Sequence, residues 1–297
     1  MDLVSVQCDI RSPFPIDLFL RLIRSLTANS SIGKAGRMHF LKAYMAEFDD
    51  IQYWTLRALK LALDDVDVTL ANVIEYDEDA CSDMVYENST LILIQCEVFV
   101  GKEEEALSGR YFSSAKKHGK AAQAKSHSNA LNRAWKSLLC SEDLPRSLIK
   151  LILSNMKSVI IPCFREPLML CDFLTDSYHH GGVITILALE GVFILITEHN
   201  LDYPDFYNDL YAVLTSSIFH VKYRERFLTL VWKFLRSSHL PSYLVAAFIK
   251  KFARLAITAP PSGALFALAI IFNLLRRFPS CRGLLDRKVN IGRSSKS

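Results

Sequence analysis

Residues that can perform chemistry are present in this sequence, but few of them have the spacing that a reaction requires. His179 and His180 are adjacent, and neighbouring helix residues point in different directions, so the two would not chelate one metal ion from a helix. Their position before Gly181-Gly182 is typical of a helix end instead. Asp172 and Asp176 lie four residues apart, and such a pair does acid–base work only with a pocket and a partner. The sequence shows neither, and we expect these carboxylates to lie on a solvated face.

Other catalytic and cofactor-binding patterns are also missing. The segment 31–36 (SIGKAG) lacks the upstream glycine and the Lys-Ser/Thr pair of a phosphate-binding loop, and neither HExxH nor GxSxG occurs. The cysteines number seven, form no CxxC pair and are scattered, which predicts reduced, mostly buried thiols of an intracellular protein. We therefore expect a protein that is not an enzyme and that holds no cofactor and no metal ion.

Cations are the more informative residue type. The sequence after Glu225 contains one acidic residue, Asp286, and thirteen Lys and Arg residues. This imbalance predicts a basic face that contacts RNA phosphates or an acidic partner protein, although a merely solvated face is the simpler alternative. The residues predicted for this face are Lys233, Arg236, Lys250, Lys251, Arg254, Arg276 and Arg277.

Tyrosines accompany these cations. Tyr203, Tyr207 and Tyr211 recur every four residues, which is the spacing of one helix face. Aromatic rings among cations can stack on bases, but rings at helical spacing more often pack in a core with the hydroxyl at its edge. We expect core packing here.

The elements that position these residues are predicted to be helices. The 297 residues are 51% hydrophobic and contain few Gly and Pro, which disfavours a loop-rich β architecture. Helical periodicity predicts helices at about 17–28, within 38–63, and at 130–139, 145–160, 166–178, 182–198, 204–215, 221–237, 242–257 and 263–277. Short gaps with proline or small polar residues separate the later ones. This alternation predicts an all-α protein, an α-solenoid of HEAT- or armadillo-like antiparallel helix pairs.

The charge pattern suggests the domain organisation. We predict an N-terminal helical region with an acidic segment (1–108), a basic linker (109–128), a helical domain (129–287) and a divergent basic tail (288–297). Residues 30–37 read as a turn-like break. Residues 91–100 (LILIQCEVFV) are a short strand or a buried helix, which periodicity does not separate.

The most regular stretch is the helix pair at 240–281, hinged at Pro260-Pro261. On its second helix, Phe266, Ile270 and Leu274 are expected to form an apolar face that further helices would cover. The apolar runs 183–197 and 264–275 are shorter than the roughly 20 residues that a membrane span needs, so we interpret both as buried helices.

Several ordered blocks between about residues 129 and 285 resemble the nucleolar complex protein 4 family, a branch of the CCAAT-binding-factor (CBF) domain proteins. The blocks are 134–139 (AWKSLL), 167–177 (PLMLCDFLTDS), 187–193 (LALEGVF), 198–204 (EHNLDYP), 218–224 (IFHVKYR), 240–261 and 273–279 (NLLRRFP). The resemblance implies a non-catalytic, all-helical nucleolar scaffold of the small-subunit processome. It further implies a partner of the nucleolar protein 14 family and a role in maturation of pre-18S ribosomal RNA and export of the small subunit.

One departure and two alternatives accompany this resemblance. Family members continue well past the 273–279 block, whereas residues 288–297 fit nothing in the family, so we expect a C-terminally truncated or alternatively spliced form. Outside ribosome assembly, the charge pattern would also suit a basic helical module that binds nucleic acid or acidic proteins. The two apolar runs would also suit a small multi-span protein of the nuclear envelope.

Overall fold

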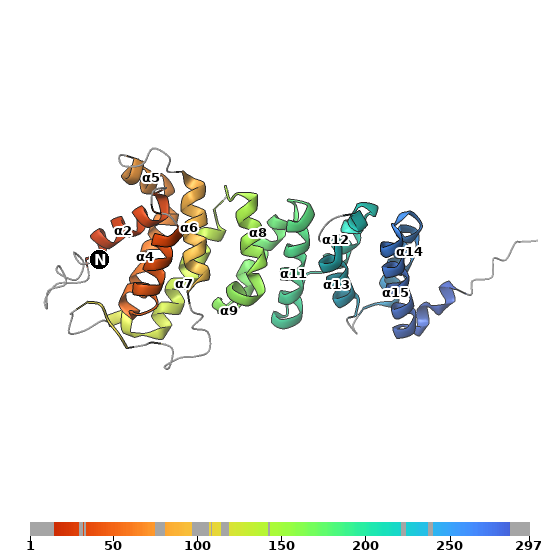
Figure 1. The fold of residues 1–297 in the computed structure, drawn as a ribbon. Helices are drawn as coiled ribbons and strands as arrows, with labels where there is room; N and C mark the ends of the chain where they lie inside the picture. Colours follow the sequence, from red (N-terminus) through yellow and green to blue (C-terminus); the bar gives the residue numbers. More distant parts are fainter. Residues whose placement is uncertain are drawn as a thin grey trace, which may run out of the picture. The chain divides into compact units, whose positions relative to one another are not determined.

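The computed structural model describes residues 15–29, 32, 34–74, 81–96, 107, 109–113, 119–141, 143–220, 224–236 and 240–285. In these ranges every regular element is helical and no strand occurs (Figure 1). The chain divides into two compact units, Met1–Gly191 and Val192–Ser297. The predicted all-α class is therefore confirmed, whereas the solenoid arrangement of the whole chain stays a prediction.

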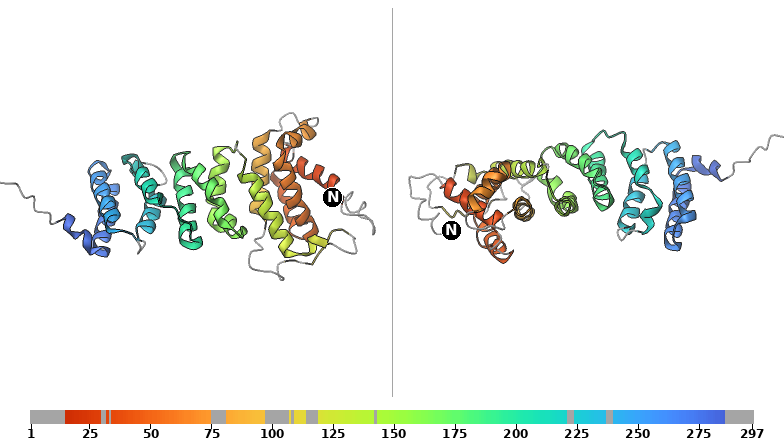
Figure 2. Two further views of the ribbon diagram at one scale, coloured as in Figure 1. Left: turned by 180° about the vertical axis from the view of Figure 1, so that it is seen from behind. Right: turned by 90° about the horizontal axis from the view of Figure 1, so that it is seen from above.

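The first unit begins with a bundle of five helices, which are α2 (Ile16–Ala28), α4 (Asp49–Asp64), α5 (Val66–Ile74), α6 (Ser82–Ile94) and α7 (Ala124–Leu139). Its central helix is α4, which packs against α2 on one side and α7 on another (Figures 1 and 2). Ile51, Leu56 and Leu59 of α4 are fully buried, as is Trp135 of α7. Apolar side chains at helical spacing on both helices thus produce the interface that the rest of this unit surrounds.

Further helical elements complete the first unit. Before α4 lie α3 (Lys34–Phe40) and the π-helix η1 (Leu41–Met45), and before α7 lies the 3₁₀ helix η2 (Gly119–Ala122). After α7 come α8 (Arg146–Ser154), the π-helix η3 (Met156–Ile160), α9 (Ile161–Cys163), the 3₁₀ helix η4 (Pro167–Leu170), α10 (Cys171–Tyr178) and α11 (Gly182–His199).

Most of the predicted helices are present, with three differences in the first half. Residues 34–37, placed in a turn-like break, form α3 together with residues 38–40. Residues 91–94 belong to α6, which decides between strand and helix in favour of a helix there. Helix α7 begins at Ala124, six residues earlier than predicted. Two parts of the predictions lie outside the described residues, namely positions 97–100 of the apolar run and the tail 288–297.

The N-terminus of α4 binds residues 109–113, which lie about 60 residues further along the chain. The carboxylate of Asp50, which is 1% exposed, accepts hydrogen bonds from the backbone N–H groups of Phe112 (2.9 Å) and Ser113 (2.8 Å). Asp49 accepts one from the N–H of Gly109 (2.7 Å). Both carboxylates also lie at the positive end of the α4 dipole, which favours their charge. Residues 109–113, predicted to open a linker, are therefore fastened to the first unit.

The second unit contains α12 (Phe206–Val213), the 3₁₀ helix η5 (Ser216–His220), α13 (Arg224–Leu235), α14 (Ser242–Thr258), α15 (Pro261–Arg277) and the 3₁₀ helix η6 (Pro279–Leu284). Helices α14 and α15 form the predicted pair, lie side by side and are separated at Pro260 (Figure 2). Gly263 allows a close approach, because a Cβ there would lie 2.7 Å from Cδ1 of the fully buried Phe219.

Helix α11 is the one described helix that is long and apolar enough to cross a membrane. Its circumference is apolar nearly throughout, and residues 184–189 are all buried. In the first unit, Gly191 lies so close to the Leu174 side chain that a Cβ would clash with it. In the second unit, the ring centres of Phe193 and Phe234 are 4.4 Å apart. This packing accords with the interpretation of residues 183–197 as a core helix.

Candidate interaction surface of the C-terminal unit

The predicted basic residues lie on three helices of the second unit. Lys233 and Arg236 are exposed at the end of α13, Lys250 and Arg254 are exposed on α14, and Arg276 and Arg277 are exposed at the end of α15. Lys250 and Arg254 are four residues apart and therefore share one side of α14. Six of the seven cations are thus available to a partner.

Lys251 behaves differently from the other six. It is half-buried, and its Nζ lies 4.6 Å from the centre of the Tyr211 ring on α12. The ring of Phe248, one turn earlier on α14, contacts the same tyrosine, with the two ring centres 5.6 Å apart. Lys251 therefore belongs to the side of α14 that packs on α12, where a cation over an aromatic ring contributes about 0.5–2 kcal/mol.

The tyrosines confirm the expectation of core packing in part. Tyr207 and Tyr211 are half-buried against Phe248, as a core role requires. Tyr203 precedes α12 and donates its hydroxyl to Asp209 Oδ2 at 2.8 Å, so it does not share that helix face. Tyr243, in contrast, is 73% exposed on the first turn of α14.

An apolar stripe runs along the outer side of α15. Leu265 is 69% exposed, Leu268 is 56% exposed and Phe272 is 66% exposed. Their spacing of three and four residues places them on one side of the helix, and Arg276 continues the same row one turn later. We call Leu265, Leu268 and Phe272 the α15 stripe. Large apolar side chains gathered on one helix side and followed by cations are typical of a protein-binding surface.

The α15 stripe corrects one sequence-based expectation. Of the three residues predicted to need a covering helix, Ile270 and Leu274 are buried and Phe266 is half-buried, because other parts of the unit, among which α14 packs on α15, already cover this side of the helix. The prediction of an apolar surface on this helix was right, but its residues were wrong. Helix α15 is apolar on two sides, and periodicity alone does not say which of them has a neighbour in the chain.

The groups that the sequence offered for chemistry lie on α10 and just after it. His179 and His180 follow the end of α10, where Gly181 and Gly182 have positive φ, so the predicted helix end is confirmed. Asp172 and Asp176 are exposed, as predicted, but both also line a hollow of about 640 Å³ together with His180, which the sequence did not indicate. The described residues contain no group of three or more potential metal ligands.

The described cysteines are all free thiols, but the expectation that they are mostly buried holds for only half of them. Cys96, Cys163 and Cys281 are buried, whereas Cys81 and Cys140 are exposed. Burial raises the pKa of Cys163 to about 12, so this thiol is protonated at neutral pH.

Comparison with known proteins now adds to this geometry. Residues 185–296, which include α12 to α15, match the CBF/Mak21 family. This part of the chain is thus a CBF/Mak21 region, an all-helical one in the described residues.

The particular group follows from the relatives. The chain is 39% identical over 241 residues to the nucleolar complex protein 4 homologue of Gallus gallus, an alignment that covers 81% of this chain and 46% of the relative. It is 40% identical over 276 residues to the homologue of Homo sapiens, covering 92% of this chain and 51% of the relative. The Arabidopsis thaliana protein NUCLEOLAR COMPLEX ASSOCIATED 4 is 46% identical over 157 residues, covering 53% of this chain and 27% of the relative. The predicted resemblance to the nucleolar complex protein 4 family is confirmed, and the chain spans about half the length of the curated relatives it matches.

Proposed function

We propose that this chain is a non-catalytic helical scaffold of the nucleolus that acts in small-subunit ribosome biogenesis and processing of pre-18S ribosomal RNA. The observation that carries the proposal is the similarity to proteins named nucleolar complex protein 4, about 40% identical over most of the chain. A CBF/Mak21 region that presents an apolar stripe and exposed cations is consistent with a protein that works by contact rather than by catalysis.

The partner surface belongs, in this proposal, to α14 and α15. A member of the nucleolar protein 14 family would place an amphipathic helix along the α15 stripe, with acidic side chains near Arg276 and Arg277. Apolar anchors supply most of the binding free energy in such a contact, and the surrounding charges supply orientation and association rate. Pre-ribosomal RNA is the alternative occupant of the exposed cations.

Co-purification tests the general function. A tagged copy of the chain is expected to concentrate in the nucleolus and to recover pre-18S RNA together with small-subunit processome proteins. A chain that stays in the nucleoplasm and recovers neither would refute the proposal.

A pair of variants tests the surface. Phe272→Asp at an exposed position is expected to abolish recovery of the partner while the melting temperature stays within a few degrees of wild type. The matched control is Met169→Asp, which alters a 49% exposed apolar residue of the first unit and should leave recovery intact. Equal recovery with both variants would show that the stripe is not the docking surface.

A further inference from the structure

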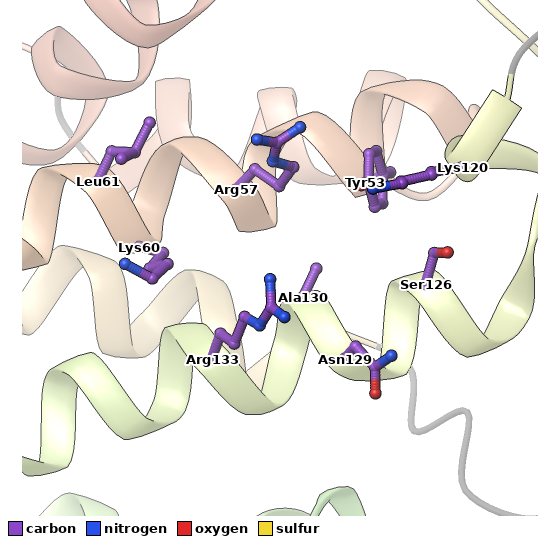
Figure 3. Close-up of a pocket in the computed structure, with 9 residues that line it drawn as sticks. All are labelled: Tyr53, Arg57, Lys60, Leu61, Lys120, Ser126, Asn129, Ala130 and Arg133. Carbon is purple, nitrogen blue, oxygen red and sulfur yellow. The ribbon is translucent and has the colours of Figure 1, made fainter.

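A hollow of about 390 Å³ lies between α4 and α7 of the first unit (Figure 3), whereas the residues predicted to bind a partner all belong to the second unit. Four cations line it: Arg57 and Lys60 from α4, Lys120 from η2 and Arg133 from α7. Tyr53 and Ser126 line it as well. Figure 3 shows these side chains along facing stretches of the two helices, with Lys120 at one end and Lys60 near the other. The stretch from Tyr53 to Lys60 rises about 10 Å along α4, so the hollow is longer than a single phosphate group.

Most of this positive charge has no counter-charge in the described residues. Lys60 pairs with Asp64, the next acidic residue on its own helix. Arg57, Lys120 and Arg133 have no carboxylate within ion-pair distance among the residues described. Helix α7 adds to the imbalance, because its first turn contains no acidic residue and its positive end opens beside Ser126. Like charges held around one hollow repel each other, and a bound anion relieves that repulsion.

One of these cations is held in position, and the backbone beside a second is anchored. The guanidinium of Arg57 lies 5.0 Å from the centre of the Trp54 ring, and its distance to the Tyr53 ring is 6.0 Å. The carbonyl of Ala121, next to Lys120, forms a 2.8 Å hydrogen bond with the buried His127 ring of α7. A planar guanidinium fixed by stacking offers its forked N–H donors at little entropic cost, which suits the paired oxygens of a phosphate.

We propose that this hollow binds the phosphate backbone of a single-stranded RNA segment. An acidic peptide is the less suitable ligand, because its recognition commonly adds apolar anchors to the charge contacts, and the only aliphatic residues of this lining are Leu61 and Ala130. The choice of RNA over DNA rests on the proposed function in ribosome biogenesis, whereas the recognition of phosphate rests only on the hollow.

A triple variant of the full chain tests the site. Arg57→Gln, Lys120→Gln and Arg133→Gln together remove three positive charges from the hollow. The matched control is Lys42→Gln, Lys150→Gln and Lys157→Gln, which removes three exposed charges of the same unit elsewhere. The measurement is fluorescence anisotropy with a labelled single-stranded RNA of about 12 nucleotides, within the length that one small domain covers.

The expected result distinguishes local from general electrostatics. Each phosphate contact contributes about 0.7 to the magnitude of the negative slope of log K against log salt for a single strand. The triple variant of the hollow should therefore reduce that magnitude by about 2 and weaken the affinity at least tenfold. The control should keep the slope. Equal losses in the two triple variants would overturn the site, since they would show a diffuse charge effect.

A single substitution separates binding from folding. Ser126→Asp places a carboxylate in the hollow and, in the first turn of α7, also favours the helix dipole. We expect RNA affinity to fall about tenfold while the melting temperature is unchanged or higher. Ser147→Asp, in the first turn of α8, is the matched control and should leave affinity intact.

Competitors identify the ligand. Unlabelled RNA should displace the probe, whereas an excess of polyglutamate of equal charge should not. Displacement by polyglutamate as effective as by RNA would overturn the proposal, and equal affinity for single-stranded DNA would overturn the choice of RNA. Loss of RNA binding in the triple variant of the hollow supports the site even if the chain is not nucleolar. Conversely, a triple variant of the hollow that binds RNA as tightly as wild type refutes the site, even if pre-18S RNA co-purifies with the chain.

Discussion

Replacing Asp50 tests how the first unit is held together. Its carboxylate accepts hydrogen bonds from the N–H groups of Phe112 and Ser113, which lie 62 and 63 residues further along the chain. It also accepts one from the N–H of Ile51, at 2.9 Å. Because Asp50 is only 1% exposed, water cannot replace these contacts without a local rearrangement. Asp50→Ala therefore removes the fastening of residues 109–113 to α4.

The magnitude follows from the two long-range bonds. A hydrogen bond to a charged group contributes about 1.5–3 kcal/mol, so two contribute about 3–6 kcal/mol. The released segment regains some hydration and conformational freedom, which favours the lower end of that range. We expect the free energy of unfolding of the first unit to fall by about 3 kcal/mol in Asp50→Ala. In Asp50→Asn, which keeps one good acceptor, we expect about half of that loss.

Urea unfolding followed by circular dichroism measures the loss, and hydrogen exchange at the Phe112 and Ser113 amides measures its location. Asp17→Ala is the control, because Asp17 is an exposed acidic residue in the first turn of α2 and should cost no more than about 1 kcal/mol. If Asp50→Ala cost no more than this control, and the two amides exchanged as in wild type, the fastening role would be refuted.

Three further changes test the packing and the pH response. Phe252→Asp should unfold the second unit, seen as loss of cooperative thermal melting, because it buries an unpaired carboxylate at a fully buried position. Gly263→Ala should lower stability by about 1–2 kcal/mol in urea titration, because the added Cβ meets the buried Phe219 ring and this clash exceeds the gain in helix propensity. Burial lowers the pKa of His127 below its ordinary value of 6.5, so the unfolded chain binds the proton at a higher pH than the folded chain. Stability should therefore be complete above pH 6.5 and fall as the pH drops through and below that value; His127→Gln should flatten this dependence in melting curves recorded across it.

Helix positions in the second half of the chain were largely predictable from the sequence. Proline and glycine separate regular apolar spacing there, and α14 and α15 begin and end within two residues of the prediction. In the first half, α3 was missed because Gly33 and Gly36 suggested a break, yet a single glycine inside a helix costs only about 1 kcal/mol, which tertiary packing outweighs.

The surfaces were harder to predict than the helices. Lys251 shares sequence surroundings with Lys250, but the 100° turn between adjacent residues directs it toward Tyr211. The hollow between α4 and α7 was not predicted at all, because its cations come from segments about 70 residues apart. The available signal was the absence of acidic residues between Glu105 and Glu142, which marked the region as basic without showing what it faces.

The α15 stripe has a consequence for the amount of this protein that a cell can maintain. Three large apolar side chains in water give copies of the chain a surface through which they associate with one another, so solubility falls as concentration rises. A partner that covers the stripe binds only the folded chain and shifts the folding equilibrium toward it in proportion to the logarithm of its own concentration. Under the proposed function, the abundance of the two proteins is then linked: synthesis in excess of the partner would yield copies that aggregate or are degraded, and the less abundant of the two would set the level of both.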